Sequence, residues 1–563
     1  MPVPRRRALR ACTLAVAVLA GTPAAAPGAD PILPLAEVRP GLQCTGLSVI
    51  RGTEISSFDV EILDVIAPEA GVAGPRLLVR ASGPAVEPGG LGQGFSGSPI
   101  VCNGRYAGAV SEALGEYGNR VVLATPIEEI LTARPARAAR VRRAPRLARA
   151  ARPLAGPLTV SGLSERTRRL LGRAARRAGR TVLAAPSSPA AGYAPVELRP
   201  GAAVAAALST GDVALGAVGT VAYRDGDRLW AFGHALDGIG RRALFLQDSY
   251  VYGVISNPLG LADFGAITYK LASSAGHVQG TITSDTFAAI AGTVGAEPPS
   301  VGLRVTARGE AGGEVVVGSR LADERALGYG TGLPLIAPLA ASQAVDRLMR
   351  SAGPVTLTMC ARFRVRELRR PFGFCNPYFG LEEALVDLDR AAALVDFFEL
   401  APLRLMAADV RLRVRRGIAD DVILAAAGPR RVRAGQRIRV RLTVQRRRGA
   451  RRTLSVPVRV PAAAKPGRQI LVLRGSGTEA VDEADLVAEI IDALTGQSRD
   501  EVREPRSVRE LARTVRALHR PLGIVARFKG DRPQLALRSE EVSYEGTARL
   551  SLRVVGRRPG HGP

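Results

Sequence analysis

Short hydrophobic segments broken by turn residues run through much of the chain and predict a mainly β protein. Three segments rich in apolar and β-branched residues fall between Gly- and Pro-rich breaks in the first part of the chain: 47–50, 58–66 and 77–80. Asn103-Gly104 then separates the apolar segments 100–102 and 106–110, and Asn-Gly is the strongest short signal for a β-hairpin. A short helix is expected over 126–131, because Pro suits a first helical turn and two acids follow it.

Similar patterns predict further strands in the second half of the chain. The segments 218–223 and 229–232 flank the turn 225–227 and indicate another hairpin. Apolar residues stand at every second position from Ile438 to Val444, with polar residues between them, which is typical of a half-buried strand. Three helices are expected outside these strands: 164–178, 480–494 and 507–518. The last of them opens with a capping box, Ser507 and Glu510.

Length and composition indicate several folded domains. The chain has 563 residues, of which 46% are hydrophobic, too many for a fully disordered chain. The formal net charge is +27, and Lys occurs only at Lys270, Lys465 and Lys529, so nearly all cations are Arg.

One stretch, residues 134–180, concentrates the positive charge. It holds fifteen Arg and one acid, Glu165, and so supplies +14 of the net +27. Such a stretch either contacts an anionic partner, namely an envelope polymer, a membrane surface or nucleic acid, or serves as a solvated linker. No aromatic residue interleaves the Arg for base stacking, so nucleic acid is not an expected partner.

The first thirty residues predict export. A basic start, Arg5 to Arg10, precedes the apolar stretch 11–20 and small residues that allow cleavage near Ala26 or Ala29. The alternative is an uncleaved membrane anchor. No later apolar run reaches the roughly 18 residues of a spanning helix, and the nearest is 332–345. We therefore expect a secreted or extracytoplasmic protein without a transmembrane segment in its mature chain.

Export changes the interpretation of the cysteines. Cys12 leaves with the signal peptide, and four remain: Cys44, Cys102, Cys360 and Cys375. An even number in an oxidising compartment permits two disulfides. Proximity in the sequence favours the pairs 44–102 and 360–375, although three pairings or four free thiols are open.

The sharpest local motif is Gly94-Phe95-Ser96-Gly97-Ser98-Pro99. A Ser between glycines in a tight turn presents its hydroxyl for attack, while nearby backbone amides point at one oxygen, as acyl transfer requires. The alternative is a plain Gly/Ser turn between strands. The chain holds no zinc-type, P-loop or dinucleotide-binding spacing, so we expect no metal and no cofactor.

A serine nucleophile needs a base, and the chain offers four His. His234 ends an apolar strand, whereas His277 lies in a Gly/Ser-rich stretch and is a weaker candidate. His519 ends a predicted helix and His561 lies in the tail. Lys270 is a further candidate, as the base of a Ser–Lys pair.

Two stretches of the chain resemble the SpoIVB-type serine peptidases, named for the bacterial sporulation-stage-IV B protease. The first joins 57–62 to 89–110 and contains GFSGSP where the family has GMSGSP. The second runs from Gly216 to His234 and is similar to the family's GTxT…GALGH segment. The resemblance covers most of residues 36–325.

This resemblance implies a trypsin-like, two-barrel serine endopeptidase that acts on protein or peptide substrates. Ser96 would be the nucleophile, His234 the general base, and the amides of Gly94 and Ser96 the oxyanion hole. The Ser segment precedes the His segment here, the reverse of the family's order, so the implied unit is permuted.

The family's third catalytic residue, an Asp upstream of the Ser, is missing at its expected place, Ala81-Ser82. Three acids are therefore candidates for orienting the histidine: Asp237, Asp248 and Glu87. No PDZ module is recognisable ahead of the His segment.

The expected organisation has six parts. They are a signal peptide (1–29), a Ser-bearing half of the peptidase domain (30–133), an Arg-rich linker and helix (134–200), a His-bearing half (201–350), a β-sandwich-like domain (351–475) and a small α+β region (476–563). Three functions stay open: an active endopeptidase, a catalytically degenerate module that binds proteins of the cell envelope, and a protein that cuts itself once.

Overall fold

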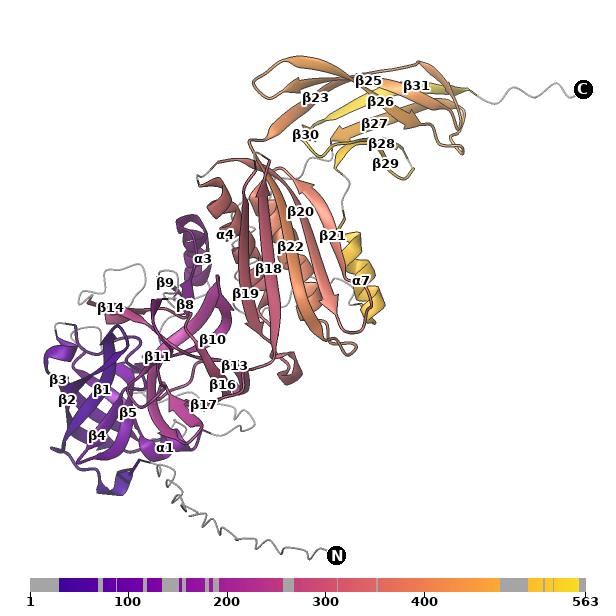
Figure 1. Cartoon of the computed structure of the whole chain (residues 1–563). Helices are drawn as coiled ribbons and strands as arrows, with labels where there is room; N and C mark the ends of the chain where they lie inside the picture. Colours follow the sequence, from indigo (N-terminus) through magenta and orange to yellow (C-terminus); the bar gives the residue numbers. More distant parts are fainter. Residues whose placement is uncertain are drawn as a thin grey trace, which may run out of the picture.

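The computed structural model shows an elongated, mainly β molecule in three parts, with the barrels at one end and a sandwich at the other (Figure 1). It describes residues 30–68, 74–87, 89–114, 119–133, 151–153, 158–177, 182–185, 192–256, 268–310, 312–350, 353–475, 505–519, 522–529 and 531–555. The expected signal peptide, most of the Arg-rich linker and the helix expected over 480–494 lie outside these residues.

The first part opens with a closed barrel of six described strands. Around the barrel their order is β4 (Pro99–Cys102), β1 (Gln43–Arg51), β2 (Glu54–Ile66), β3 (Arg76–Ser82), β6 (Val121–Pro126) and β5 (Arg105–Leu114), and the pairing of β4 with β5 closes it. The β4–β5 turn is the expected Asn103-Gly104 hairpin, and both residues have positive φ. The short helix α1 (Ile127–Leu131) follows β6 where expected.

A second barrel of six described strands packs against the first. Its order is β10 (Ala203–Gly211), β13 (Gly240–Asp248), β16 (Val278–Asp285), β17 (Ile290–Val294), β12 (Arg228–Ala231) and β11 (Ala214–Asp225), closed by the β10–β11 pairing. The expected hairpin at 225–227 joins β11 to β12. The mainly β class is confirmed, and the two closed barrels fit the trypsin-like architecture that the resemblance implies.

A seam of small apolar residues joins the two barrels. Val49 of the first barrel packs with Ala205 and Val218 of the second. The strand pair β14 (Val251–Ser256) and β15 (Thr268–Ala272) lies beside this seam and bonds back to the first barrel through Gly52 and Gln93.

The middle part is a sheet covered on one face by helices. The strands β18 (Ser300–Gly309), β19 (Glu314–Ala322), β20 (Val355–Val365), β21 (Phe372–Tyr378) and β22 (Leu405–Arg416) extend the sheet of the second barrel. The helices α3 (Glu165–Arg177), α4 (Leu333–Met349), α5 (Leu381–Asp396) and α7 (Val508–Ala517) share one apolar core with it. The expected helix 164–178 is therefore α3, and it packs through Leu170 and Leu171.

The last part is a β-sandwich. One layer is β26 (Arg451–Arg459), β25 (Arg437–Arg446), β23 (Ala419–Ala427) and β30 (Val542–Glu545). The other is β24 (Arg431–Arg433), β31 (Thr547–Val555), β27 (Gly467–Gly475), β28 (Gly523–Phe528) and β29 (Gln534–Arg538).

The sheet pairings cross the domain boundaries expected at 351 and 475. Strands β20 to β22 belong to the helix-covered sheet of the middle part, and the sandwich begins at β23. Strand β27 pairs with β28 and β31, so residues on both sides of 475 build one sandwich. The chain also returns to the middle part at α7, which begins at the expected capping box with the hydroxyl of Ser507 accepting from the amide of Glu510.

Two disulfides join neighbouring strands, and both pairs are those that proximity in the sequence favours. Cys44–Cys102 links β1 to β4 in the first barrel, and Cys360–Cys375 links β20 to β21 at directly opposed positions. Among the described helices, none combines the length and the apolar character needed to cross a membrane.

Candidate active site

The Ser96 turn enters the seam between the barrels just before β4. Gly94 and Gly97 have φ of +89° and +88°, which glycine adopts without strain. A Cβ on Gly97 would lie 1.9 Å from the carbonyl oxygen of Thr220 in the second barrel, so only glycine fits there. Ser96 is fully buried, and its Oγ has no hydrogen-bond partner.

The backbone amides of this turn divide into two groups. The amides of Phe95, Gly97 and Ser98 donate to carbonyls at 3.1, 2.7 and 2.9 Å. Within the part of the chain that the structure describes, the amides of Gly94 and Ser96 donate to no acceptor. These are the two amides that the resemblance assigns to the oxyanion hole, and both are free to receive an oxygen atom.

His234 lies on the loop that follows β12, on the second barrel. Its Nδ1 lies 2.6 Å from the carbonyl oxygen of Ala235. Because a carbonyl only accepts, Nδ1 carries the hydrogen and Nε2 has a lone pair. Nε2 is buried and has no partner. The ring is therefore held in the tautomer that a general base needs.

The pKa of His234 is lowered to about 4. Burial is the main cause, the Ala235 hydrogen bond opposes it, and the positive charge of Arg76 adds to the lowering. Arg76 comes from β3 of the first barrel and pairs with Glu112 at 3.3 Å. The imidazole is consequently neutral at physiological pH and is a weak base.

Backbone contacts bring the Ser96 and His234 loops to the same seam. The amide of Thr220 donates to the Ser96 carbonyl at 2.8 Å, and the Phe232 amide donates to the Thr220 carbonyl at 3.3 Å. The Thr125 hydroxyl of the first barrel donates to the Gly233 carbonyl at 2.6 Å. Ser96 Oγ and Nε2 of His234 are not hydrogen-bonded to each other. The two groups share a seam, and the proton-transfer contact between them is not made in this conformation.

No family model, curated protein or solved structure matches this chain. The geometry of the seam therefore carries the functional argument.

The three candidate acids have other partners. Asp248 accepts from Tyr193 and His277, at 2.8 and 2.9 Å. Asp237 pairs with Arg242 at 3.3 Å, and Glu87 with Arg120 at 3.5 Å. His234 makes its hydrogen bond to a backbone carbonyl, so none of the three acids orients it here. His277, the weaker candidate base, is bound to Asp248 instead.

Lys270 does not pair with Ser96. Its Nζ donates to Ser48 Oγ at 2.7 Å and to Thr220 Oγ1 at 3.1 Å, and Ser98 Oγ donates to Ser48 Oγ at 2.9 Å. Ser48 and Thr220 were not sequence candidates, because each is an ordinary strand residue whose partner lies far along the chain.

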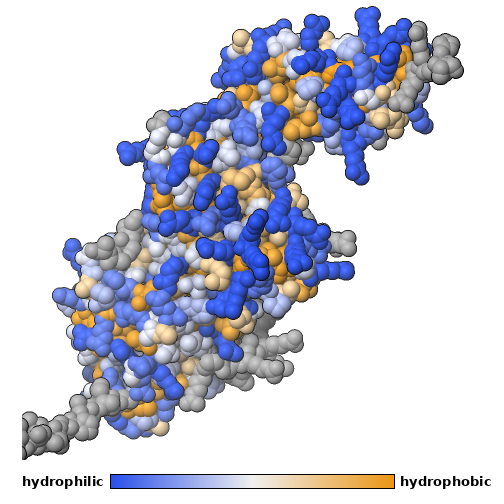
Figure 2. All heavy atoms as spheres, turned by 45° about the vertical axis from the view of Figure 1, so that its right-hand side comes forward, coloured by the Kyte–Doolittle hydropathy of each residue, from blue (hydrophilic) through white to orange (hydrophobic). Residues whose placement is uncertain are grey.

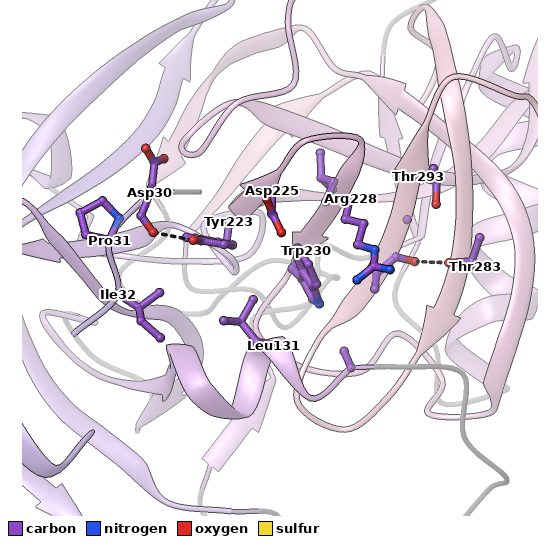
Figure 3. Close-up of a pocket in the computed structure, with 14 residues that line it drawn as sticks. Asp30, Pro31, Ile32, Leu131, Tyr223, Asp225, Arg228, Trp230, Thr283 and Thr293 are labelled. Atoms are coloured by element: carbon purple, nitrogen blue, oxygen red, sulfur yellow. Dashed lines mark hydrogen bonds between the residues drawn. The ribbon is translucent and has the colours of Figure 1, made fainter. Parts of the chain in front are cut away.

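A cavity of about 880 Å³ is lined by residues of the second barrel, of α1 and of the N-terminal segment at Asp30. Trp230 and Tyr223 of the second barrel form one wall and Leu131 of α1 another (Figure 3). The Tyr223 hydroxyl donates to the Asp30 carbonyl at 2.5 Å. Trp230 of β12 lines the cavity, and His234 lies four residues further along the chain on the loop after β12, so the cavity is a candidate place for a side chain of a bound polypeptide.

Proposed function

We propose that this protein is an exported serine endopeptidase of the SpoIVB type. One observation supports the proposal: a buried serine hydroxyl, a buried imidazole nitrogen with a lone pair, and two unbonded amides all lie at the seam of two closed β-barrels. The trypsin-like peptidase unit, with its Ser half ahead of its His half, is part of the proposal.

Each group has a role in acyl transfer. Nε2 of His234 takes the Ser96 proton as Oγ attacks the carbonyl carbon of the substrate, and the amides of Gly94 and Ser96 hold the resulting oxyanion. The protonated imidazole then gives its proton to the leaving amine as the C–N bond breaks. A water molecule hydrolyses the acyl-enzyme by the same route and frees Ser96.

The Ala235 carbonyl takes the place of the missing acid. It holds the Nδ1–H tautomer, as a triad Asp does, but it carries no charge to stabilise the imidazolium. Because the base is weak and the site is enclosed, we expect slow turnover that depends on a substrate or partner opening the seam.

Labelling with a fluorophosphonate probe tests the proposal. Labelling of the mature wild-type protein, absent in Ser96→Ala and in His234→Ala, is the expected result. Ser284→Ala is the matched control, because Ser284 is also a buried serine whose Oγ lacks a partner, on β16 of the second barrel. A folded wild-type protein that stays unlabelled even with candidate substrates would contradict the proposal.

Self-processing is a variant of the same proposal. In this variant, the peptidase site cleaves a peptide bond in the Arg-rich linker of its own chain. A Ser96→Ala chain that is still cleaved in purified form would exclude it.

A second candidate function is binding without catalysis, favoured by the enclosed site and by the lack of an acid on His234. The uncovered face of the middle sheet offers a binding surface, where five exposed arginines have no ion-pair partner among the described residues: Arg304, Arg362, Arg364, Arg411 and Arg413. Figure 2 shows hydrophilic side chains projecting from the middle part and the sandwich. Such a face suits an anionic polymer of the envelope.

Export agrees with the two disulfides, which persist in oxidising compartments. The part of the chain expected to be a signal peptide lies outside the described residues, so detection of the protein outside the cytoplasm is the direct test.

A further inference from the structure

Lys270 is a buried cation directly beneath the Ser96 turn. It lies on β15, is 4% exposed, and packs its methylene groups against Gly94, where a Cβ would lie 3.0 to 3.3 Å from them. Its Nζ lies 4.5 Å from the centre of the Phe95 ring, in addition to its bonds to Ser48 and Thr220. The three hydrogens of an ammonium group thus meet two hydroxyl oxygens and one aromatic face.

These acceptors come from both barrels and from the turn itself. Ser48 lies on β1 of the first barrel, Thr220 on β11 of the second, and Phe95 is the residue before Ser96. A single side chain therefore ties together the three pieces of chain that meet at the candidate site.

The turn is held to this side chain by a second set of bonds. Thr220 Oγ1, which accepts from Lys270, donates to the Gly94 carbonyl at 3.1 Å. Ser98 Oγ bonds to Ser48 Oγ, the other acceptor of Lys270. A backbone hydrogen bond also joins β15 to the start of the turn, since the Lys270 amide donates to the Gln93 carbonyl at 2.9 Å. One hydroxyl therefore bridges each end of the turn to the ammonium group: Thr220 bridges Gly94, and Ser48 bridges Ser98.

No carboxylate or other charged group of the described residues faces Lys270. Its pKa is lowered to about 7, with desolvation by burial as the one cause. Among the described residues, the side chains that accept hydrogen bonds from Nζ are the hydroxyls of Ser48 and Thr220, so these bonds and the Phe95 ring hold the proton on Nζ.

We propose that Lys270 is a positioning residue whose ammonium group, bridging Ser48, Thr220 and Phe95, holds the Gly94–Ser98 turn so that the amides of Gly94 and Ser96 face one oxygen. The inference deepens the proposed function and rests on it. Lys270 contacts neither the substrate carbonyl nor Ser96 Oγ, and acts through the turn.

Lys270→Met tests this assignment, because methionine keeps a long unbranched side chain and removes the charge and both hydrogen bonds. Lys465→Met is the matched control, since Lys465 is exposed. We expect the rate of fluorophosphonate labelling to fall about tenfold to a hundredfold in Lys270→Met, somewhat less than the loss caused by removing an oxyanion-hole donor itself. The control is expected to label at the wild-type rate.

The pH profile separates positioning from a general loss of stability. In the wild type, labelling should rise as pH increases through about 4, where His234 becomes neutral, and fall through about 7, where Lys270 loses its proton. Lys270→Met should keep the acid limb and lose the alkaline limb. Because the chain has three lysines, ¹³Cε-lysine NMR can assign the alkaline limb to the Lys270 signal directly.

Ser48→Ala is the second variant, for use if Lys270→Met does not fold. It removes one acceptor of the ammonium group and keeps the charge, so the midpoint of the Lys270 signal should shift to lower pH and the alkaline limb should shift with it. An unshifted alkaline limb in this variant would overturn the inference.

Hydrogen exchange of the peptide covering residues 93–98 tests the role of Lys270 without relying on peptidase activity, so it distinguishes a failure of this inference from a failure of the proposed function. If the wild type is not labelled at all, the proposed function fails, and faster exchange of this peptide in Lys270→Met still supports positioning. Wild-type labelling, an unchanged pH profile and unchanged exchange in Lys270→Met would overturn the role of Lys270 while leaving the peptidase proposal intact.

Discussion

Single residues set the chemistry of the seam through burial. Ser96, His234 and Lys270 are all removed from water, and neither the imidazole nor the ammonium group has a carboxylate partner among the described residues. Uncharged groups orient both side chains. The Ala235 carbonyl orients His234, and the Ser48 and Thr220 hydroxyls with the Phe95 ring orient Lys270. Local motifs indicated Ser96 and His234, but a single hydroxyl on a strand, such as that of Ser48, gives no signal in the sequence.

Gly97→Ala should destabilise the first barrel and abolish labelling of Ser96. The substitution forces a side chain into positive φ and places it 1.9 Å from a backbone oxygen, so we expect a cost well above the roughly 1 kcal/mol of left-handed φ alone. Gly104→Ala is the control, since its φ is +76° and nothing lies within 4 Å. Urea unfolding measures the free energy of unfolding of both variants. Equal losses of this free energy in the two variants would contradict the close approach of Gly97 to Thr220.

Acid should destabilise the folded protein through His234. Its pKa is about 4 when folded and about 6.5 when unfolded, so the unfolded chain binds the proton more tightly. The stability that the neutral, buried ring provides is complete above about pH 6.5 and is lost as pH falls toward 4, by about 3 kcal/mol. Urea unfolding from pH 7 to 4 should show a shallower loss in His234→Gln, and parallel curves would show that His234 is not buried as described.

Secondary-structure elements were the best-predicted level of this fold. Both hairpins, the helix after Pro126 and the capping box at Ser507 follow from residues close together in the sequence, and each is present in the structure. The sheet pairings were not predictable, because β18 and β22 lie side by side although more than ninety residues separate them. Local pattern therefore determines the strands, and packing determines their neighbours.

Removing the Cys44–Cys102 bridge should loosen the barrel that carries the Ser96 turn. The bridge closes a 58-residue separation and ties β1 to β4, which begins at Pro99 just after the turn. Loop entropy gives a loss of about 4 kcal/mol for the Cys44→Ala, Cys102→Ala variant, against about 3 kcal/mol for the pair at 360 and 375 with its separation of 15. Urea unfolding quantifies both losses. Only the first variant should also slow fluorophosphonate labelling, and slower labelling in both would contradict a local effect.

At the scale of the whole molecule, the middle part and the sandwich are each formed by segments that are not continuous in the sequence. After building most of the sandwich, it returns to the middle sheet at α7 and then completes the sandwich with β28 to β31. The domain boundaries expected at 351 and 475 do not describe this arrangement. Boundaries inferred from composition assume that each domain is one continuous segment, whereas the middle part and the sandwich are each built from separate segments.

Leu511→Ala should test how strongly α7 holds the middle part. Leu511 is fully buried in the core that α7 shares with α4 and α5, so truncation should cost about 3 kcal/mol. Hydrogen exchange should speed up in β20 to β22 and stay unchanged in the two barrels. Arg516→Ala, on the same helix and exposed, is the control, and faster exchange in the barrels would show that the parts unfold as one unit.

The sequence by itself determined the β class, the hairpins and the two motifs that lie at the seam, and it favoured the cysteine pairs without deciding them, because each depends on turn chemistry, alternation or proximity along the chain. Only the tertiary structure decided what surrounds those motifs. It gave His234 a carbonyl in place of an acid, placed Asp248 with His277, and brought Lys270 to Ser48 across 222 positions of sequence. The last contact comes from the packing of the β14–β15 strand pair against the first barrel, which no local pattern encodes.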